Sequence, residues 1–199
     1  SNEEAIPFWM YTNTNASKGS ETNFSGAGDI KASYAFSNSL LEAGAAFYYR
    51  DGVTDEFQRR DLYVKFQNNW LKATAGAKKQ DEKLHGLSAT NKNFLLSSNA
   101  RPIPGLLIEA NNPLKISNSL GLDWGIAHYS LNDDRIVNNT MVHYKRLGLH
   151  WKIKENHILK GTLQHFAQWG GTSPTFGKLN NDFKAFVDVF FARKSSDIT

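Results

Sequence analysis

The sequence of 199 residues contains no cysteine. Without a thiol the chain has no disulfide, no thiolate metal site and no cysteine nucleophile, which excludes several enzyme classes. Long hydrophobic runs are also missing, and without 18 consecutive apolar residues the sequence predicts no transmembrane helix. The chain begins Ser1-Asn2-Glu3-Glu4, without the basic start and apolar stretch of a secretory signal. We therefore expect a chain that is mature, trimmed or a fragment.

An excess of one charge is nearly absent. The 23 Lys and Arg residues stand against 19 Asp and Glu residues, and the cations alternate with apolar residues instead of forming a basic run. We therefore expect no nucleic-acid partner. The length and a hydrophobic content of 40% suit a single domain over residues 1–199. Short repeats and low-complexity tracts are absent too.

Motifs for catalysis and metal binding are lacking. The carboxylate pairs, such as Asp133-Asp134, are typical of solvated turns, and Ser97-Ser98 lacks the Gly-x-Ser-x-Gly elbow of a serine hydrolase. We expect no catalytic residue, no enzyme activity, no metal and no cofactor. The histidines show neither His-x-His nor His-Glu-x-x-His spacing; they are His85, His128, His143, His150, His157 and His165.

Strict alternation of apolar and polar residues is abundant instead. Such a period of two predicts β-strands with one apolar face, and a chain that is all-β and antiparallel. The expected strands cover residues 5–13, 29–36, 41–50, 61–66, 71–77, 104–110, 119–130, 138–153 and 157–169.

The two faces of these strands differ in a way that two architectures explain. In a soluble sandwich the apolar face would point to a core. In a transmembrane β-barrel the apolar face would meet lipid and the polar face a wet interior. We prefer the barrel because the polar faces carry many charges. The expected lipid-facing residues are Ile30, Tyr34, Leu41, Phe47, Leu62, Val64 and Leu71, and the expected interior residues are Asp29, Glu42, Asp61, Lys65 and Lys72.

Connection lengths support the barrel, since outer-membrane barrels place short turns on one side and long loops on the other. Nine strands is an odd number, and single-chain bacterial barrels have an even one, so we expect a partial barrel. The short connections are residues 37–39, 68–69 and 154–156, and the long ones are 14–25, 51–56, 79–103, 131–137 and 170–182. Every long loop falls on one side if the strand at residue 5 runs outward and residues 104–110 count as one strand that ends in a turn at 111–118.

The period changes near the C-terminus. Apolar residues at 183, 186, 187, 190 and 191 predict a short amphipathic helix, with Asn181 or Asp182 as its N-cap. A strand with residues 183, 185, 187, 189 and 191 on one side is the alternative.

Three segments carry a family resemblance: residues 86–104, which contain Asn-Ala-Arg-Pro-Ile-Pro, residues 138–147, and residues 165–171, which contain Gln-Trp-Gly-Gly. Together they resemble the Wzi-type capsule assembly and attachment proteins of bacterial outer membranes, over residues 29–171. The resemblance implies the N-terminal half of a barrel of about eighteen strands, with a small helical element that blocks its periplasmic end. The helix expected near the C-terminus is either part of that element or a helix that lies against the barrel. The signature residues are Asn99, Arg101, Pro102, Pro104 and Trp169.

The resemblance implies a non-catalytic, lectin-like protein of the bacterial outer membrane that anchors or organises capsular or exported polysaccharide at the cell surface. The implied partners are that polysaccharide, outer-membrane lipid and lipopolysaccharide, and other outer-membrane proteins. Two alternatives stay open: an outer-membrane channel or porin for diffusion or export, and an accessory subunit of another outer-membrane assembly.

Candidate binding residues follow from charge and loop position. We expect the outer loops to contact polysaccharide through Arg59, Arg60, Asp134 and Arg135, because guanidinium and carboxylate groups hydrogen-bond sugar hydroxyls. Pro102 and Pro104 stiffen the chain around Arg101. We expect Arg101 to pair with an interior carboxylate, Asp123 or Glu109; contact with an acidic sugar is the alternative. Trp169 at the outer rim serves either an aromatic girdle or sugar stacking.

Overall fold

The computed structural model describes residues 14, 17–79, 100–131 and 136–193. Within them the chain is mostly antiparallel β-sheet with one short helix, which confirms the all-β prediction. The strand expected at residues 5–13 lies outside the described residues. The elements are β1 Ser25–Ala35, β2 Ser39–Arg50, β3 Phe57–Asn68, β4 Leu71–Ala77, β5 Gly105–Ala110, β6 Leu114–Lys115, β7 Leu120–Ser130, β8 Met141–Lys154, β9 His157–Trp169, β10 Thr172–Ser173, β11 Gly177–Lys178 and α2 Phe183–Phe190.

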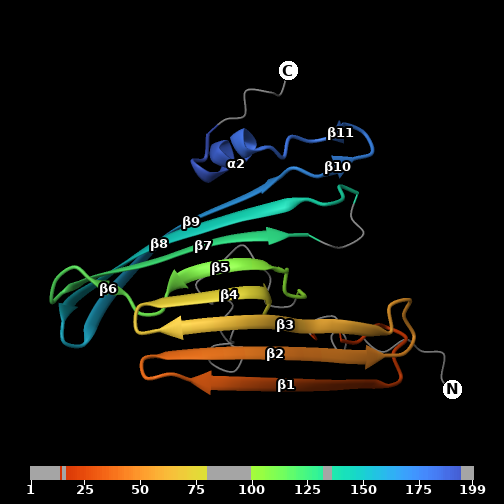
Figure 1. The fold of residues 1–199 in the computed structure, drawn as a ribbon, viewed down its shortest axis with the longest axis horizontal. Helices are drawn as coiled ribbons and strands as arrows, with labels where there is room; N and C mark the ends of the chain where they lie inside the picture. Colours follow the sequence, from red (N-terminus) through yellow and green to blue (C-terminus); the bar gives the residue numbers. More distant parts are fainter. Residues whose placement is uncertain (1–13, 15–16, 80–99, 132–135, 194–199) are drawn as a thin grey trace.

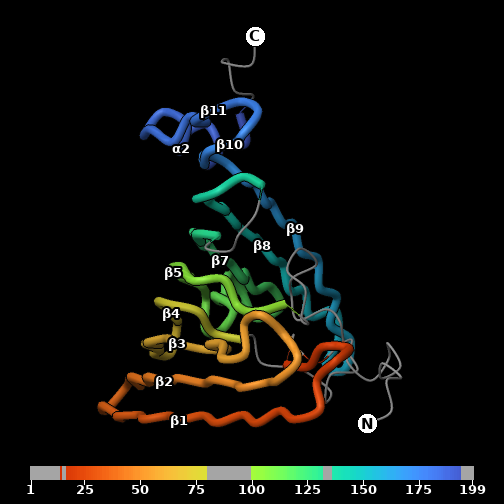
Figure 2. The backbone as a smooth tube through the Cα atoms, turned by 90° about the vertical axis from the view of Figure 1, so that its right-hand side faces the viewer, coloured from red at the N-terminus to blue at the C-terminus, as the bar shows by residue number. Residues whose placement is uncertain are grey.

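The main sheet is a meander in which successive strands lie side by side (Figure 1). Its order is β1-β2-β3-β4-β5-β7-β8-β9, and the short β6 pairs with β7. The sheet twists strongly, so that β9 is steeply inclined to β1 (Figure 2). Two connections expected as plain loops hold extra pairing: β6 lies in the turn at 111–118, and β10 and β11 form a hairpin within 170–182.

The short and long connections separate as expected. Because each strand pairs antiparallel with the next, connections alternate between the two edges where strands end. The turns between β1 and β2, β3 and β4, β5 and β7, and β8 and β9 therefore share one edge. The connections between β2 and β3, between β4 and β5, and between β7 and β8 share the other, which we call the loop edge. The segment after β9 also begins at the loop edge (Figure 1).

The register divides the side chains into two faces. Residues directly opposite each other in an antiparallel pair share a face. Leu41 pairs with Tyr34 and Phe66, and this set belongs to what we call the apolar face. Glu42 pairs with Ser33 and Lys65, and this set belongs to the charged face.

Burial of the two faces is the reverse of a soluble sheet. On the apolar face Ile30 is 72% exposed, Val64 49% and Leu163 75%. On the charged face Glu42 and Glu109 are each 7% exposed. The two faces therefore have the composition expected from the alternation. Of the side chains compared, those on the charged face are the more deeply buried.

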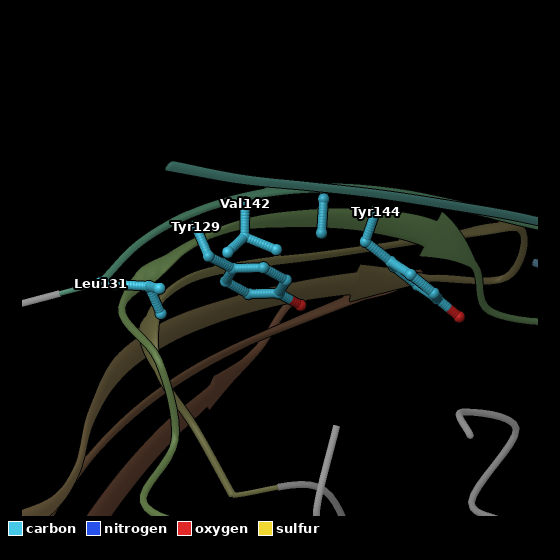
Figure 3. Close-up of a cluster of buried hydrophobic side chains, with 5 residues drawn as sticks. Tyr129, Leu131, Val142 and Tyr144 are labelled. Carbon is cyan, nitrogen blue, oxygen red and sulfur yellow. The ribbon is translucent and has the colours of Figure 1, made fainter. Parts of the chain in front are cut away.

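A hydrophobic cluster lies on the charged face near the loop edge. Tyr129, Val142 and Tyr144 project from β7 and β8 to the same side of the sheet, together with Leu131 just after β7 (Figure 3). Val142 is fully buried and Tyr144 is 2% exposed. These side chains form a small buried apolar core at one end of the charged face.

The C-terminal segment is helical, not a strand. Asp182 is the N-cap of α2, and its Oδ1 accepts a 2.7 Å hydrogen bond from the backbone N–H of Ala185. At the other end, Lys145 Nζ of β8 donates to the carbonyl oxygen of Phe190. A cation at a helix C-terminus interacts favourably with the helix dipole, so β8 helps to hold α2 in place.

Candidate functional site: a row of charges across the sheet

A row of paired charges crosses the charged face from β2 to β8. Its first part joins Glu42 and Lys65, which are direct neighbours in register, with Lys65 Nζ 3.1 Å from Glu42 Oε1. The Tyr63 hydroxyl donates a 2.7 Å hydrogen bond to the same carboxylate oxygen. The Glu42 carboxylate is thereby held by one cation and one hydroxyl, two residues apart on β3.

The second part of the row centres on Arg146 of β8. Its Nη1 lies 2.7 Å from Glu109 Oε2, and its Nη2 lies 3.1 Å from Asp123 Oδ1. Lys72 Nζ lies 2.5 Å from the other oxygen of Glu109. The side chains of Arg146, Glu109 and Asp123 are 6–9% exposed. Four strands, β4, β5, β7 and β8, are thus connected by one buried ion-pair network.

Glycines make room for the long side chains of this row. Gly125 stands opposite both Glu109 and Arg146, where an added Cβ would lie 3.2 Å from Glu109 Cβ and 3.3 Å from Arg146 Cζ. Gly44 stands opposite Tyr63, where a Cβ would come within 2.8 Å of three ring and hydroxyl atoms. The alternation of small and large residues across strands lets the charged groups reach each other.

The ion pairs of the row hold its carboxylates in fixed positions between neighbouring strands, an arrangement that suits structural ordering better than proton transfer. A general acid or base needs a carboxylate that is free to exchange its proton with a substrate. Here Glu109 is held between Lys72 and Arg146, and Asp123 is bound by Arg146. Buried charges are retained when they are paired and hydrogen-bonded, and breaking such a pair is strongly destabilising. This arrangement fixes the register of neighbouring strands.

The predicted loop arginines lie elsewhere than expected. Arg59 and Arg60 belong to β3 and not to an outer loop, because β2 and β3 continue to pair as far as Tyr49 and Phe57. The register shifts between Ala46 and Phe47, and Arg60 is the extra residue of this β-bulge. Arg60 Nε pairs with Asp61 Oδ2 at 3.1 Å. Both arginines still lie in the half of β3 nearest the loop edge.

The prediction for Arg101 was wrong about its partner. Among the described residues, Glu109 and Asp123 pair with Lys72 and Arg146, and Arg101 is exposed. Arg146 takes its place because the register sets β8 beside β7, which carries Asp123, and two strands from β5, which carries Glu109. Pro102 and Pro104 lie in an extended stretch before β5, and the Pro104 carbonyl accepts a 3.0 Å hydrogen bond from the Ser130 N–H. Asn99, Asp134 and Arg135 lie outside the described residues.

Trp169, the last residue of β9, belongs to an aromatic cluster on the apolar face. Its ring lies 5.5 Å from the His128 ring and 6.0 Å from the Phe186 ring, centroid to centroid. Helix α2 covers this end of the face, and the Phe190 ring lies 5.3 Å from the His143 ring. His143 is 1% exposed, although Leu147 on the same face of β8 is 51% exposed. The helix therefore buries what would otherwise be surface.

Three histidines that looked scattered in the sequence meet under α2. His128 and His143 are opposite in register, and Lys145, two residues after His143, is opposite His165. Each histidine ring lies 6.2 Å from the next. Neither ring nitrogen of His143 has a hydrogen-bond partner among the described residues. The three histidines lie on three different strands, so their spacing along the sequence does not indicate a cluster. The cross-strand register brings them together.

Comparisons with known proteins give no match for this chain. No protein-family model, no curated protein and no solved structure matches the chain. In the described part of the chain, no three or more histidine and carboxylate side chains are placed to hold a metal ion. None of the described helical segments has the length and apolarity to cross a membrane.

Proposed function

We propose that the chain forms part of an outer-membrane β-barrel that retains capsular or exported polysaccharide at the cell surface and catalyses no reaction. The observation that carries the membrane part is the reversal of the two faces between β2 and β8: many apolar side chains are exposed, whereas the charges of the row from Glu42 to Arg146 are paired and mostly buried. Exposed apolar faces of this extent are unfavourable in water. They are what a barrel wall presents to lipid, with polar residues inside.

The polysaccharide part is supported by the family resemblance of residues 86–104, 138–147 and 165–171 and by polar groups near the loop edge. Arg59 and Arg60 are partly exposed there, and guanidinium groups donate to hydroxyls and to uronic-acid carboxylates. Each such contact contributes only about 1 kcal/mol. Retention of a polymer therefore depends on many weak contacts along its length.

A charge on the apolar face tests the membrane part. Val64→Lys should lower membrane insertion, because a cation at mid-bilayer costs about 2–4 kcal/mol. Thr162→Lys is the matched control, since Thr162 pairs with Gly148 on the charged face and is exposed. Insertion is measured as the fraction that stays with membranes after a urea wash. Equal insertion of the two variants contradicts the membrane proposal.

Paired substitutions test the polysaccharide part. The variant Arg59→Gln/Arg60→Gln should release polymer from the cell surface into the medium while total polymer stays constant. Lys152→Gln/Lys154→Gln removes two exposed cations from the opposite edge and should release none. Cell-bound and free polymer are assayed at equal barrel levels. Polymer that stays bound in the first variant argues against an anchor.

A channel is the second candidate, because the row of charges lies on the face that would line a barrel interior. Conductance in planar bilayers and swelling of liposomes measure an open bore directly. A channel predicts stepwise conductance that changes in Lys72→Gln, whereas an anchor predicts none. Recovery of the chain only in complex with another outer-membrane protein would favour an accessory subunit.

A further inference from the structure

Helix α2 has a second aromatic side besides the one that packs on the sheet. Phe186 and Phe190 face β7–β9. Phe183, Val187 and Phe191 follow each other at intervals of four residues, which places them in a row along one flank of the helix. Phe183 is 79% exposed and Phe191 is 59% exposed. We call this row the aromatic flank.

Cations border the aromatic flank. Lys184 is exposed on the next helical position, and the Arg193 guanidinium lies over the Phe191 ring, 5.1 Å from its centroid. Lys178 of β11 is also exposed. The segment 172–193 carries these three cations and two carboxylates, of which the Asp182 carboxylate caps the helix. The surface beside the flank is therefore complementary to anionic groups.

The position of α2 puts the aromatic flank on the same side of the sheet as the apolar face. The helix lies over the loop-edge end of β7–β9, on the same face as the exposed Leu147 and Leu163. Aromatic side chains with Lys and Arg beside them are the composition of helices that lie in the plane of a membrane interface. Lys and Arg stems lie along apolar surface while their charged ends reach polar groups.

We propose that the aromatic flank of α2 rests in the headgroup layer of the bilayer, where Lys184 and Arg193 contact anionic lipid phosphates. This inference rests on the proposed membrane function and names the lipid class that the outer wall contacts at the loop edge. The helix then sets the depth at which β7–β9 lie in the bilayer. Phe183 and Phe191 insert below the phosphates, and Lys184 and Arg193 lie at the level of the phosphates.

The absence of cysteine allows a unique probe at each position. The full chain with Phe191→Cys, labelled with an environment-sensitive dye, is reconstituted in phosphatidylcholine vesicles with and without phosphatidylglycerol, and quenching by lipids spin-labelled near the headgroup is measured. Strong quenching in the anionic vesicles is expected. A label at Val64→Cys reports the apolar face, and a label at Thr162→Cys on the charged face is the unquenched control.

The contribution of charge is tested in the same labelled protein. Lys184→Gln/Arg193→Gln should lose the extra quenching seen with phosphatidylglycerol, and Lys152→Gln/Lys154→Gln should keep it. An unquenched label at 191 beside a quenched label at 64 overturns this inference and leaves the membrane proposal standing. If neither label is quenched, both fail. Shielding of the 191 label by added polysaccharide or protein, and not by lipid, also overturns it.

Discussion

At the scale of single residues, the charged face depends on complementary sizes and signs. Arg146 reaches two carboxylates because Gly125 leaves the space that its guanidinium occupies. Glu109 in turn joins Lys72 and Arg146 from strands on either side. Each member of this network neutralises the buried charge of another member. Removal of any one therefore leaves a buried charge without its counter-charge.

Removal of the central cation should be costly. Arg146→Met leaves Glu109 and Asp123 buried without their main partner, and we expect a loss of about 3–5 kcal/mol in the free energy of unfolding. Denaturant titration in detergent micelles measures it. Lys160→Met on the exposed part of the same face should change stability by less than about 0.5 kcal/mol. Equal effects would show that the network contributes nothing specific.

A methyl group at Gly125 should be destabilising as well. The Cβ of Gly125→Ala meets Glu109 and Arg146 atoms at 3.2–3.3 Å, and such overpacking costs about 1–3 kcal/mol. Gly161→Ala in β9 is the matched control because no atom lies within 4 Å of its added Cβ. Thermal unfolding of both variants is compared. A Gly125 variant as stable as the Gly161 variant would mean that Arg146 moves aside freely.

At the scale of elements, α2 is held by contacts that reach it from three strands. Phe186 lies edge-on to His128 of β7 and His143 of β8, and Trp169 of β9 lies beside it. The helix has only eight residues, and helices this short are not stable alone in water. Its stability therefore comes from this docking, and its loss would open the histidine cluster.

Truncation of the docked ring should release the helix. For Phe186→Ala we expect the free energy of packing of α2 on the sheet to fall by about 1 kcal/mol. Full burial of a phenyl ring contributes about 1.5–3 kcal/mol, and Phe186 is half-buried. Hydrogen exchange of the α2 amides in detergent should become faster. Phe183→Ala, at the exposed start of the helix, is the control. Unchanged exchange in the Phe186 variant would place the docking energy elsewhere.

At the scale of the whole molecule, the meander places its tightest turns at one edge, where the longer connection of residues 111–119 between β5 and β7 also lies. The short turns lie at one edge, and the connection at 51–56 and the segment at 170–182 lie at the other. In an outer-membrane barrel this asymmetry would correspond to the periplasmic and external sides. The topology of the sheet thus predicts which edge faces outward, and labelling of cells can check this.

Accessibility from outside should follow that sorting. Thr54→Cys, at the loop edge, should react with a membrane-impermeant maleimide on intact cells, because long loops face outward in such barrels. Ser37→Cys, in the turn between β1 and β2, should react only after the cells are lysed. The chain without introduced cysteine is the background control. A reactive Ser37 position on intact cells would invert the topology.

Much of the sheet could be predicted from local pattern. The alternation at residues 29–36 and 41–50 predicted a hairpin that β1 and β2 form, because side chains of a strand point to opposite faces at every step. The change of period near the C-terminus predicted a helix with Asn181 or Asp182 as its cap, and the structure confirms the helix with Asp182 as the cap. Arg59 and Arg60 were predicted in a loop and lie in β3 instead, since a β-bulge extends β3 to residues before the start of its clear alternation at residue 61.

The candidate site was less accessible to sequence reasoning. Partners in a sheet come from strands far apart along the chain, so nothing near Glu109 in the sequence indicates Arg146, and Arg101 was the nearer and wrong choice. The same holds for His128, His143 and His165, which became neighbours only through the register of β7, β8 and β9.

The sequence by itself determined which face of each strand is apolar, because a period of two requires no partner strand. It also placed the tight turns of the hairpins and narrowed the start of the helix to Asn181 or Asp182. The tertiary structure alone decided which charges pair and which end of the apolar face α2 covers. The physical reason is that cross-strand register and helix docking arise from packing between distant segments, and side-chain size and charge select them only once the strands are side by side.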